Sequence, residues 1–514
     1  MSVLSAILIK TGDRVFNQVK LVTVLVCLLV LTACQSDTAS PIIRFALQSE
    51  PLSLDPRMAT DASSERLNHL IYRALVKFDD NFRPVPDLAN WQRLSPTHYR
   101  FTLADTGRLF HNDSRLTARD VAACYSFILE ASSASPHRGN LAHIQRIEVI
   151  DDNTVDFILQ RPDVLFPGRL TIGIPAAQTA ARFNPVGSGP FKVYDNTHMS
   201  ALELTRAADN QSFRFLHVPN ATVRVLKLIR GEIDILQNDI PAEFINYLSI
   251  QPGIQVVGHP GSTFSYLGFN MDDPVTGQPE LRRAIALSID RQALIDNLLG
   301  ERAVLSHSLL PPQHWASQKQ LDGFSYEPDK ARQILKEMGY DEQNRPQLTF
   351  KTTTDSLRLR IAAAIQQQLA QVGINMEIRS YDWGTFYADI KAGNFQLYGL
   401  QWVGIRSPDI YQYVFHSTSL PPSGANRGRY RSRDVDQWID KMLASGSPGD
   451  IPANLDKVRG RLLEELPYIP LWFENQVYAS NTNIKNYRLS LDGNYDALVY
   501  VTKQTKATSK VSGL

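Results

Sequence analysis

The spacing of apolar residues along the chain predicts parallel α/β layers, most clearly over residues 347–379. Leu348 and Phe350 alternate with polar residues as in a strand, and apolar residues then recur at helical spacing up to Gly373. A second alternating run follows at once. A helix that ends at glycine and leads directly into a strand is the usual connection between parallel strands. The segment therefore predicts a βαβ unit.

Other stretches predict further helices of the same kind. Asn220 is suited to cap a helix that ends at Gly231 and leads into a short strand. The longest helical pattern is Leu281–Leu299, which stops at Gly300. Residues 328–339 form another, with proline at the start and glycine at the end. These patterns place the chain in the α/β class.

Residues 82–160 follow a different pattern, with more turns and shorter alternating runs. Residues 99–103 alternate as a strand, and residues 147–159 have the form of a hairpin around a polar turn. Such a region does not continue the α/β layers. We therefore expect a smaller, β-rich insertion here.

Length and charge limit the possible classes of function. At 514 residues the chain exceeds what one hydrophobic core usually organises, so two or three lobes are expected. The 53 lysines and arginines nearly cancel the 52 aspartates and glutamates. This balance excludes the strong field that would draw the whole chain to nucleic acid, so no nucleic-acid partner is expected.

The N-terminus has the features of an export signal. Basic residues precede the apolar run 21–31, which is too short for a comfortable transmembrane span. The run ends in Leu-Thr-Ala-Cys, which resembles the lipobox of bacterial lipoproteins. We predict a lipoprotein signal peptide over 1–33, acylation of Cys34, and a polar, lipid-anchored tether over 34–41. A plain signal peptide or a short anchor helix, with an incidental Cys34, is the alternative.

The three cysteines provide no disulfide framework. Cys27 lies in the signal and Cys34 would be acylated, which leaves Cys124 alone in the mature chain. Cys124 lies in the apolar, helical run 121–128. This setting favours a buried structural thiol over a nucleophile.

Several phrases, in fixed order across most of the mature chain, resemble the family 5 extracellular solute-binding proteins, the receptors of peptide and nickel ABC importers. The phrases are Phe45–Pro56, Leu70–Val76, Pro86–Ala89, Phe110–Asp113, Leu116–Val121, Thr154–Phe157, Pro185–Lys192, Gly268–Asn270, Arg282–Ala286 and Ser288–Arg291. The resemblance implies an α/β, two-lobed periplasmic-binding-protein fold of type II with an inserted domain. It also implies a ligand that is enclosed when the lobes close.

This fold implies a division of the chain into interleaved segments. The expected ranges are lobe I over 42–81 and 181–268, the inserted α+β domain over 82–180, lobe II over 269–474, and a lobe I return segment with a C-terminal tail over 475–514.

The resemblance implies the extracytoplasmic substrate-binding component of an ABC importer, which delivers a peptide or peptide-like solute to a permease and its ATPase. A monomer anchored through lipid, with no cofactor, metal or catalysis, is expected. The chain lacks Gly-x-Ser-x-Gly, His-Glu-x-x-His and a Walker loop. Two alternatives stay open: a sensing or assembly lipoprotein of the same fold, and a hydrolase with dispersed carboxylates.

Trp402 is the first candidate for ligand contact. It ends the strand-like run 395–402 and opens an irregular stretch that includes Val403 and Gly404. Ligands bind where strands of open α/β sheets end, so the position favours contact with the ligand. A tryptophan of the core is the alternative.

The stretch that follows lacks the usual amine anchor. In the oligopeptide and dipeptide receptors the phrase resembles Trp-x-x-Asp-Tyr-x-Asp-Pro, and its first aspartate pairs with the α-amine of the ligand. Here Ile405 stands at that aspartate and Arg406 at the tyrosine. An apolar side chain cannot stabilise a desolvated ammonium. Either Asp409 meets the amine from a shifted loop, or the ligand presents a carboxylate or phosphate to Arg406, or Arg406 is solvated at a rim.

Two further candidates follow other predicted strands. Glu50 comes after the first strand, in a loop that the resemblance places at the cleft, and the alternative is a surface carboxylate. Asn270 follows the strand 264–269 and either bonds the ligand backbone or holds the crossing between the lobes, of which the second is favoured.

The loop 417–434 is rich in glycine, proline and arginine, and long ordered loops of this kind often line sites. We expect its arginines to be solvated or at the rim of the cleft. Asn426 and Arg427 are candidates for a segment that closes on the ligand. His416 is held in reserve in case a metal chelate is the cargo.

Overall fold

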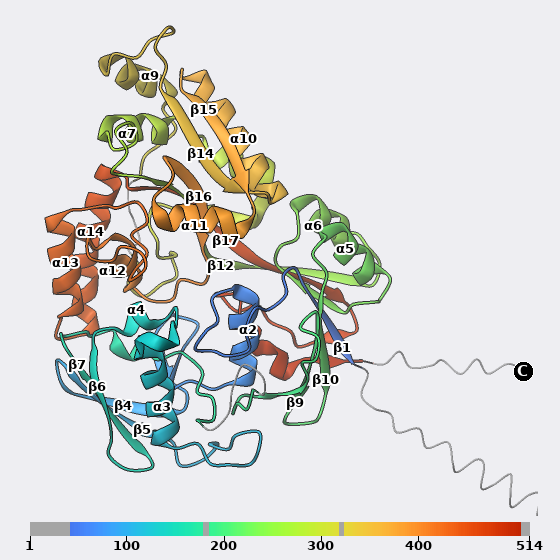
Figure 1. Cartoon of the computed structure of the whole chain (residues 1–514). Helices are drawn as coiled ribbons and strands as arrows, with labels where there is room; N and C mark the ends of the chain where they lie inside the picture. The colour runs from blue at the N-terminus through green and yellow to red at the C-terminus, as the bar shows by residue number, and fades with distance from the viewer. Residues whose placement is uncertain (1–41, 178–184, 318–322, 505–514) are drawn as a thin grey trace, which may run out of the picture. The chain divides into compact units, whose positions relative to one another are not determined.

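The structure, a computed structural model, describes residues 42–177, 185–317 and 323–504 (Figure 1). Contacts between residues group 43–514 into one unit and 1–42 into another. The predicted signal peptide, Cys34 and the tether lie outside the described residues. No helix in the described part of the chain is long and apolar enough to cross a membrane.

An eleven-stranded mixed sheet runs through the unit 43–514. Ten strands follow the order β15 (Asn375–Tyr381), β14 (Gln347–Thr353), β16 (Leu397–Trp402), β12 (Ile254–Phe269), β17 (Tyr468–Asn481), β11 (Ile235–Gln237), β1 (Ile43–Leu47), β10 (Ser212–His217), β9 (Ala201–Arg206) and β8 (Phe191–Asp195), and β13 (Ala303–Leu305) pairs with β17 beside this path. Parallel pairs occur on both sides of β12 and β17, and antiparallel pairs join the rest. The α/β prediction is confirmed.

The long strands β12 and β17 connect the two halves of the sheet. They pair antiparallel from Ile254 opposite Asn481 to Gly268 opposite Tyr468. At one end β17 pairs with β11, and at the other β12 pairs with β16. We call the half with β1 and β8–β11 lobe I and the half with β13–β16 lobe II. The predicted boundary at 268/269 falls at the end of β12, and that at 474/475 falls inside β17.

Helices pack on each half, and Figure 1 shows α10 beside β14 and β15. Lobe I has α2 (Ala62–Ile71), α5 (Ala221–Ile229) and α6 (Ala242–Ser249). Lobe II has α7 (Pro279–Ser288), α8 (Arg291–Leu294), α9 (Pro328–Glu337), α10 (Ser356–Gln371), α11 (Trp383–Ala392), α12 (Ile410–Phe415), α13 (Arg433–Leu443) and α14 (Ile451–Glu465). The predicted βαβ unit is β14–α10–β15, in which the two strands pair in parallel.

One predicted helix is wrong in its extent. The pattern Leu281–Leu299 does not form a single helix, because α7 ends at Ser288 and Ile289 is extended. Asp290 then caps α8, where its carboxylate accepts a hydrogen bond from the Ala293 amide at 2.9 Å. The apolar stripe continues across this break, which is why periodicity alone did not reveal it.

The predicted insertion contains a separate antiparallel sheet. Its strand order is β4 (Ala89–Ser95), β5 (His98–Leu103), β7 (Thr154–Leu159) and β6 (Ile144–Val149). The helix α3 (Ala118–Leu129) packs on this sheet around a core of its own, and α4 (Arg138–Leu141) follows. Cys124 is buried in that core, and burial raises the pKa of its thiol to about 12, as a structural thiol requires.

Short strand pairs complete the fold, β2 (Val76–Phe78) with β3 (Pro84–Pro86) and β18 (Ile484–Lys485) with β19 (Thr502–Lys503).

The turn around Gly187 fixes the C-terminal end of α2. The Gly189 amide donates to the Ile71 carbonyl at 2.8 Å. A Cβ atom on Gly187 would lie 1.9 Å from that same carbonyl oxygen. Only glycine permits this close approach of two backbones. The turn therefore holds α2 against the start of β8.

We expect Gly187→Ala to destabilise the protein by about 1–3 kcal/mol, because the new methyl group forces the turn away from α2. Gly460→Ala is the matched control, since a Cβ at this position in α14 meets no atom within 4 Å. Alanine favours a helix over glycine, so the control is expected to retain or raise the melting temperature. Equal melting temperatures for the two variants in thermal denaturation would contradict this role of the turn.

Candidate functional site

A cavity of about 370 Å³ lies between lobe II and the part of the chain that precedes residue 180. One wall comes from residues 56–78, which include α2, and from residues 136–141 and 168–173 of the insertion. The other wall is residues 402–413, directly after β16. The volume is within the range of pockets that enclose small ligands.

Six of the predicted site residues line this cavity together. They are Trp402, Val403, Gly404, Ile405, Arg406 and Asp409. The strand β16 ends at Trp402, which pairs opposite Phe264 of β12. Gly404 then adopts a left-handed φ of 64°, so the chain turns out of the sheet and across the cavity.

Trp402 lies against a buried cation. The guanidinium of Arg427 is 4.5 Å from the centre of the Trp402 ring, and it donates to the hydroxyls of Tyr266 and Tyr387. Arg427 is only 6% exposed. The expectation that it is solvated or at the rim is therefore wrong, because aromatic rings cover it. Its contact with the indole ring holds Trp402 in place at the cavity wall.

Arg406 pairs with a carboxylate from the C-terminal part of the chain, outside the cavity lining. Its Nε lies 3.1 Å from Oδ2 of Asp492, a residue that follows β18. Burial alone would raise the pKa of Asp492, but the Arg406 guanidinium and the Ser490 hydroxyl outweigh it and lower that pKa. Asp492 is therefore ionised at neutral pH. The charge of Arg406 is compensated within the protein.

Asp409 is paired in the same way. Its Oδ2 lies 2.7 Å from the buried Arg169 guanidinium, which also contacts Asp163 at 2.6 Å and donates to Gln412. Burial opposes ionisation of Asp163, yet the adjacent guanidinium lowers the pKa of this carboxyl below its usual range. Asp163 and Asp409 together hold Arg169 between the insertion and lobe II.

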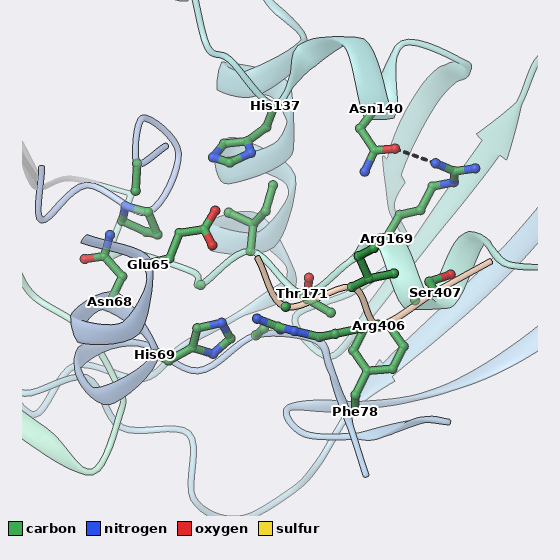
Figure 2. A pocket seen from close by; sticks show the side chains of 18 of the residues that line it. Glu65, Asn68, His69, Phe78, His137, Asn140, Arg169, Thr171, Arg406 and Ser407 are labelled. Carbon is green, nitrogen blue, oxygen red and sulfur yellow. Dashed lines mark hydrogen bonds between the residues drawn. The ribbon is translucent and has the colours of Figure 1, made fainter. Parts of the chain in front are cut away.

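Glu65, His69 and His137 are among the side chains of the cavity that the sequence pattern does not predict. Glu65 and His69 lie four residues apart on α2, so one face of the helix presents both to the cavity. Figure 2 shows the Glu65 carboxylate between the two imidazoles. Burial lowers the pKa of His137, and burial with the Arg406 guanidinium lowers that of His69 to about 4. Both imidazoles are therefore neutral at pH 7.

Glu50, Asn270 and Asn426 lie outside the cavity lining. Glu50 is exposed. The Asn270 amide donates to the carbonyls of Gly393 and Phe395, which ties the start of β16 to the end of β12. Asn426 donates to the His416 and Tyr430 carbonyls within its own loop. These bonds give both side chains structural partners, and they favour a structural role for Asn270.

His416 does not line the cavity either. It is buried, and its Nδ1 lies 2.8 Å from the Thr418 hydroxyl. The loop 417–434 adds no residue to the lining. In the described residues, no three His, Cys, Asp or Glu side chains are arranged to hold a metal ion.

Two lobes joined by paired crossing strands, an inserted domain, and a cavity between them define the class of two-lobed solute receptors. The model of the bacterial extracellular solute-binding proteins, family 5, matches residues 83–422. The chain belongs to this family.

Known proteins agree with this membership. The dipeptide-binding protein of Escherichia coli is 24% identical over 466 residues, which cover 81% of this chain and 86% of that protein. The structure of DppA from Helicobacter pylori in complex with the peptide STSA matches with a TM-score of 0.80 and 23% identity, and covers 91% of this chain and 98% of that one. NikZ from Campylobacter jejuni in complex with Ni(L-His) matches with a TM-score of 0.79 and 20% identity. The match covers 90% of this chain and 99% of that one. These structural matches establish the two-lobed fold.

We expect His69 to make the protein sensitive to mild acid. Unfolded chains protonate histidine near pH 6.5, whereas folded His69 resists protonation until about pH 4. The unfolded state binds more protons in this window, so the free energy of unfolding falls as the pH is lowered through it. Denaturant titrations at pH 7.5 and 5 measure this free energy. Between the two pH values it should fall less for His69→Gln than for the wild type. His198→Gln, at an exposed position, is the control, and an equal loss in all three proteins would contradict the assignment.

Proposed function

We propose that this protein is the solute-binding component of an ABC importer and captures a peptide or peptide-like solute in the cavity between its lobes. The observation that carries the proposal is the lining, which combines lobe II residues 402–413 with α2 and the insertion. A ligand that contacts both walls stabilises the closed arrangement. The family supports this function, since its members are extracellular solute-binding proteins.

The names of related proteins support a peptide-like cargo. The Escherichia coli relative is a dipeptide-binding protein, and the Helicobacter pylori structure holds the peptide STSA. The cavity of about 370 Å³ suits a short ligand. We further propose that the ligand is released unchanged, so that the protein is a receptor and has no catalytic activity.

The proposal includes an extracytoplasmic location and a lipid anchor at Cys34, delivered by the signal peptide over 1–33. Several acyl chains anchor a protein stably, whereas one chain binds a membrane only marginally. Permease and ATPase subunits are the proposed partners. The lobe and insertion ranges predicted from the sequence are kept as part of this proposal.

The function is tested by native mass spectrometry of the protein purified from its own source. We expect a small molecule that dissociates on denaturation and that raises the melting temperature when it is added back. Its mass should be unchanged after prolonged incubation with the protein. A ligand that is consumed would indicate an enzyme.

We expect Trp402→Ala to weaken binding of the copurified ligand about tenfold, because an aromatic wall contributes on the order of 1–2 kcal/mol. Trp383→Ala is the control, since Trp383 is 57% exposed and outside the lining. Isothermal titration calorimetry with both variants provides the comparison. Unchanged affinity in Trp402→Ala would place the site elsewhere.

We expect Cys34→Ser to move the protein from the membrane fraction to the soluble fraction, because a serine cannot accept the thioether-linked lipid. Fractionation and intact mass measurement of both proteins check this. A membrane-bound Cys34→Ser protein would favour an uncleaved anchor helix instead.

A further inference from the structure

Glu65 differs from every other charged side chain that lines the cavity. The lining contains four charged residues, namely Glu65, Arg169, Arg406 and Asp409. Three of them have counter-ions at 2.7 to 3.1 Å within the protein. Among the described residues, no hydrogen bond or ion pair engages the Glu65 carboxylate. It is exposed to the cavity, where a ligand can reach it.

The charge around the cavity is negative. The lining and its ion-pair partners Asp163 and Asp492 contain two guanidiniums and four carboxylates, an excess of two negative charges. His69 and His137 stand on either side of Glu65 in Figure 2 and are neutral at pH 7, so they do not offset its charge. A cationic group that enters this space is attracted, and an anionic group is repelled.

The opposite wall cannot provide this charge. Ile405, at the position where related receptors have the amine-binding aspartate, is 5% exposed and packs in the lobe II core. Asp409 is held by Arg169 at 2.7 Å, so using it for a ligand would leave a buried guanidinium with one counter-ion fewer. Arg406 is likewise held by Asp492, which leaves no free cation there for a ligand carboxylate.

We propose that Glu65 on α2 is the counter-charge for an ammonium group of the bound solute, so that cation recognition has moved from lobe II to lobe I. This inference rests on the proposed function and specifies its ligand as a peptide-like solute with a free amine. The segment Asp61–Ile71 holds the carboxylate in place, since Asp61 caps α2 and the turn at Gly187 fixes its other end.

The test uses the full-length protein and a peptic digest of casein, with half of the digest acetylated at all amines. Peptides retained after equilibrium dialysis are quantified by mass spectrometry. We expect the wild type to retain free-amine peptides. Acetylation should reduce their retention at least about tenfold, because it removes a charge-assisted hydrogen bond. Glu65→Gln should reduce retention of the free-amine peptides by a similar factor, and Glu65→Asp should retain most of it.

Glu342→Gln is the matched control, because Glu342 is exposed, lies far from the lining in sequence, and its substitution changes the net charge equally. Its retention should equal that of the wild type. Melting temperatures of all variants check that each is folded, and the acetylation comparison in the wild type needs no variant.

Each outcome separates the two proposals. If the wild type selects free amines but Glu65→Gln binds equally well, the role of Glu65 is overturned. If free and acetylated peptides bind equally, the ammonium requirement is overturned while the proposed receptor function stands. If neither digest binds, the peptide-like cargo is overturned, and the inference about Glu65 falls with it.

Discussion

The antiparallel pairing of β12 with β17 is the constraint on which the rest of the structure depends. These two strands carry the backbone hydrogen bonds that join the halves of the sheet, and each half then adds its own strands at opposite ends of the pair. Because β16 pairs with β12, the residues after Trp402 emerge beside the crossing. The cavity wall from lobe II is thereby set by the register of this pairing.

Most charged side chains that line the cavity already have a counter-ion within the protein. Arg169 meets Asp409 from the opposite wall of the cavity, and Arg406 meets Asp492 from the C-terminal part of the chain. Burying a charge is costly unless it is paired. The paired charges are therefore not available to the ligand, whereas the carboxylate of Glu65 is available to bind it. Arg427 shows another solution, since tyrosine hydroxyls and the ring of Trp402 surround its guanidinium.

Local patterns in the sequence predicted much of the fold. The βαβ unit and the insertion have clear periodicity, and Trp402 was found because a strand ends there. The residues Glu65 and His69 gave no such signal, since polar residues on an amphipathic helix usually face solvent. The composition of its loop predicts a solvated Arg427, because composition does not show which rings will cover the guanidinium. The partners Asp492 and Asp163 are distant in sequence from Arg406 and Asp409, so only the fold reveals the pairs.

The ion pairs Arg169–Asp409 and Arg406–Asp492 have a consequence for how residues 402–413 separate from their partners. Attraction between unit charges 4 Å apart is about 4 kcal/mol at an effective dielectric constant of 20 and about 1 kcal/mol in bulk water. Water that enters between the paired charges therefore weakens their attraction. When one pair opens and admits water, the other pair becomes easier to separate. We expect separation of Arg406 from Asp492 and of Arg169 from Asp409 to be cooperative in this sense.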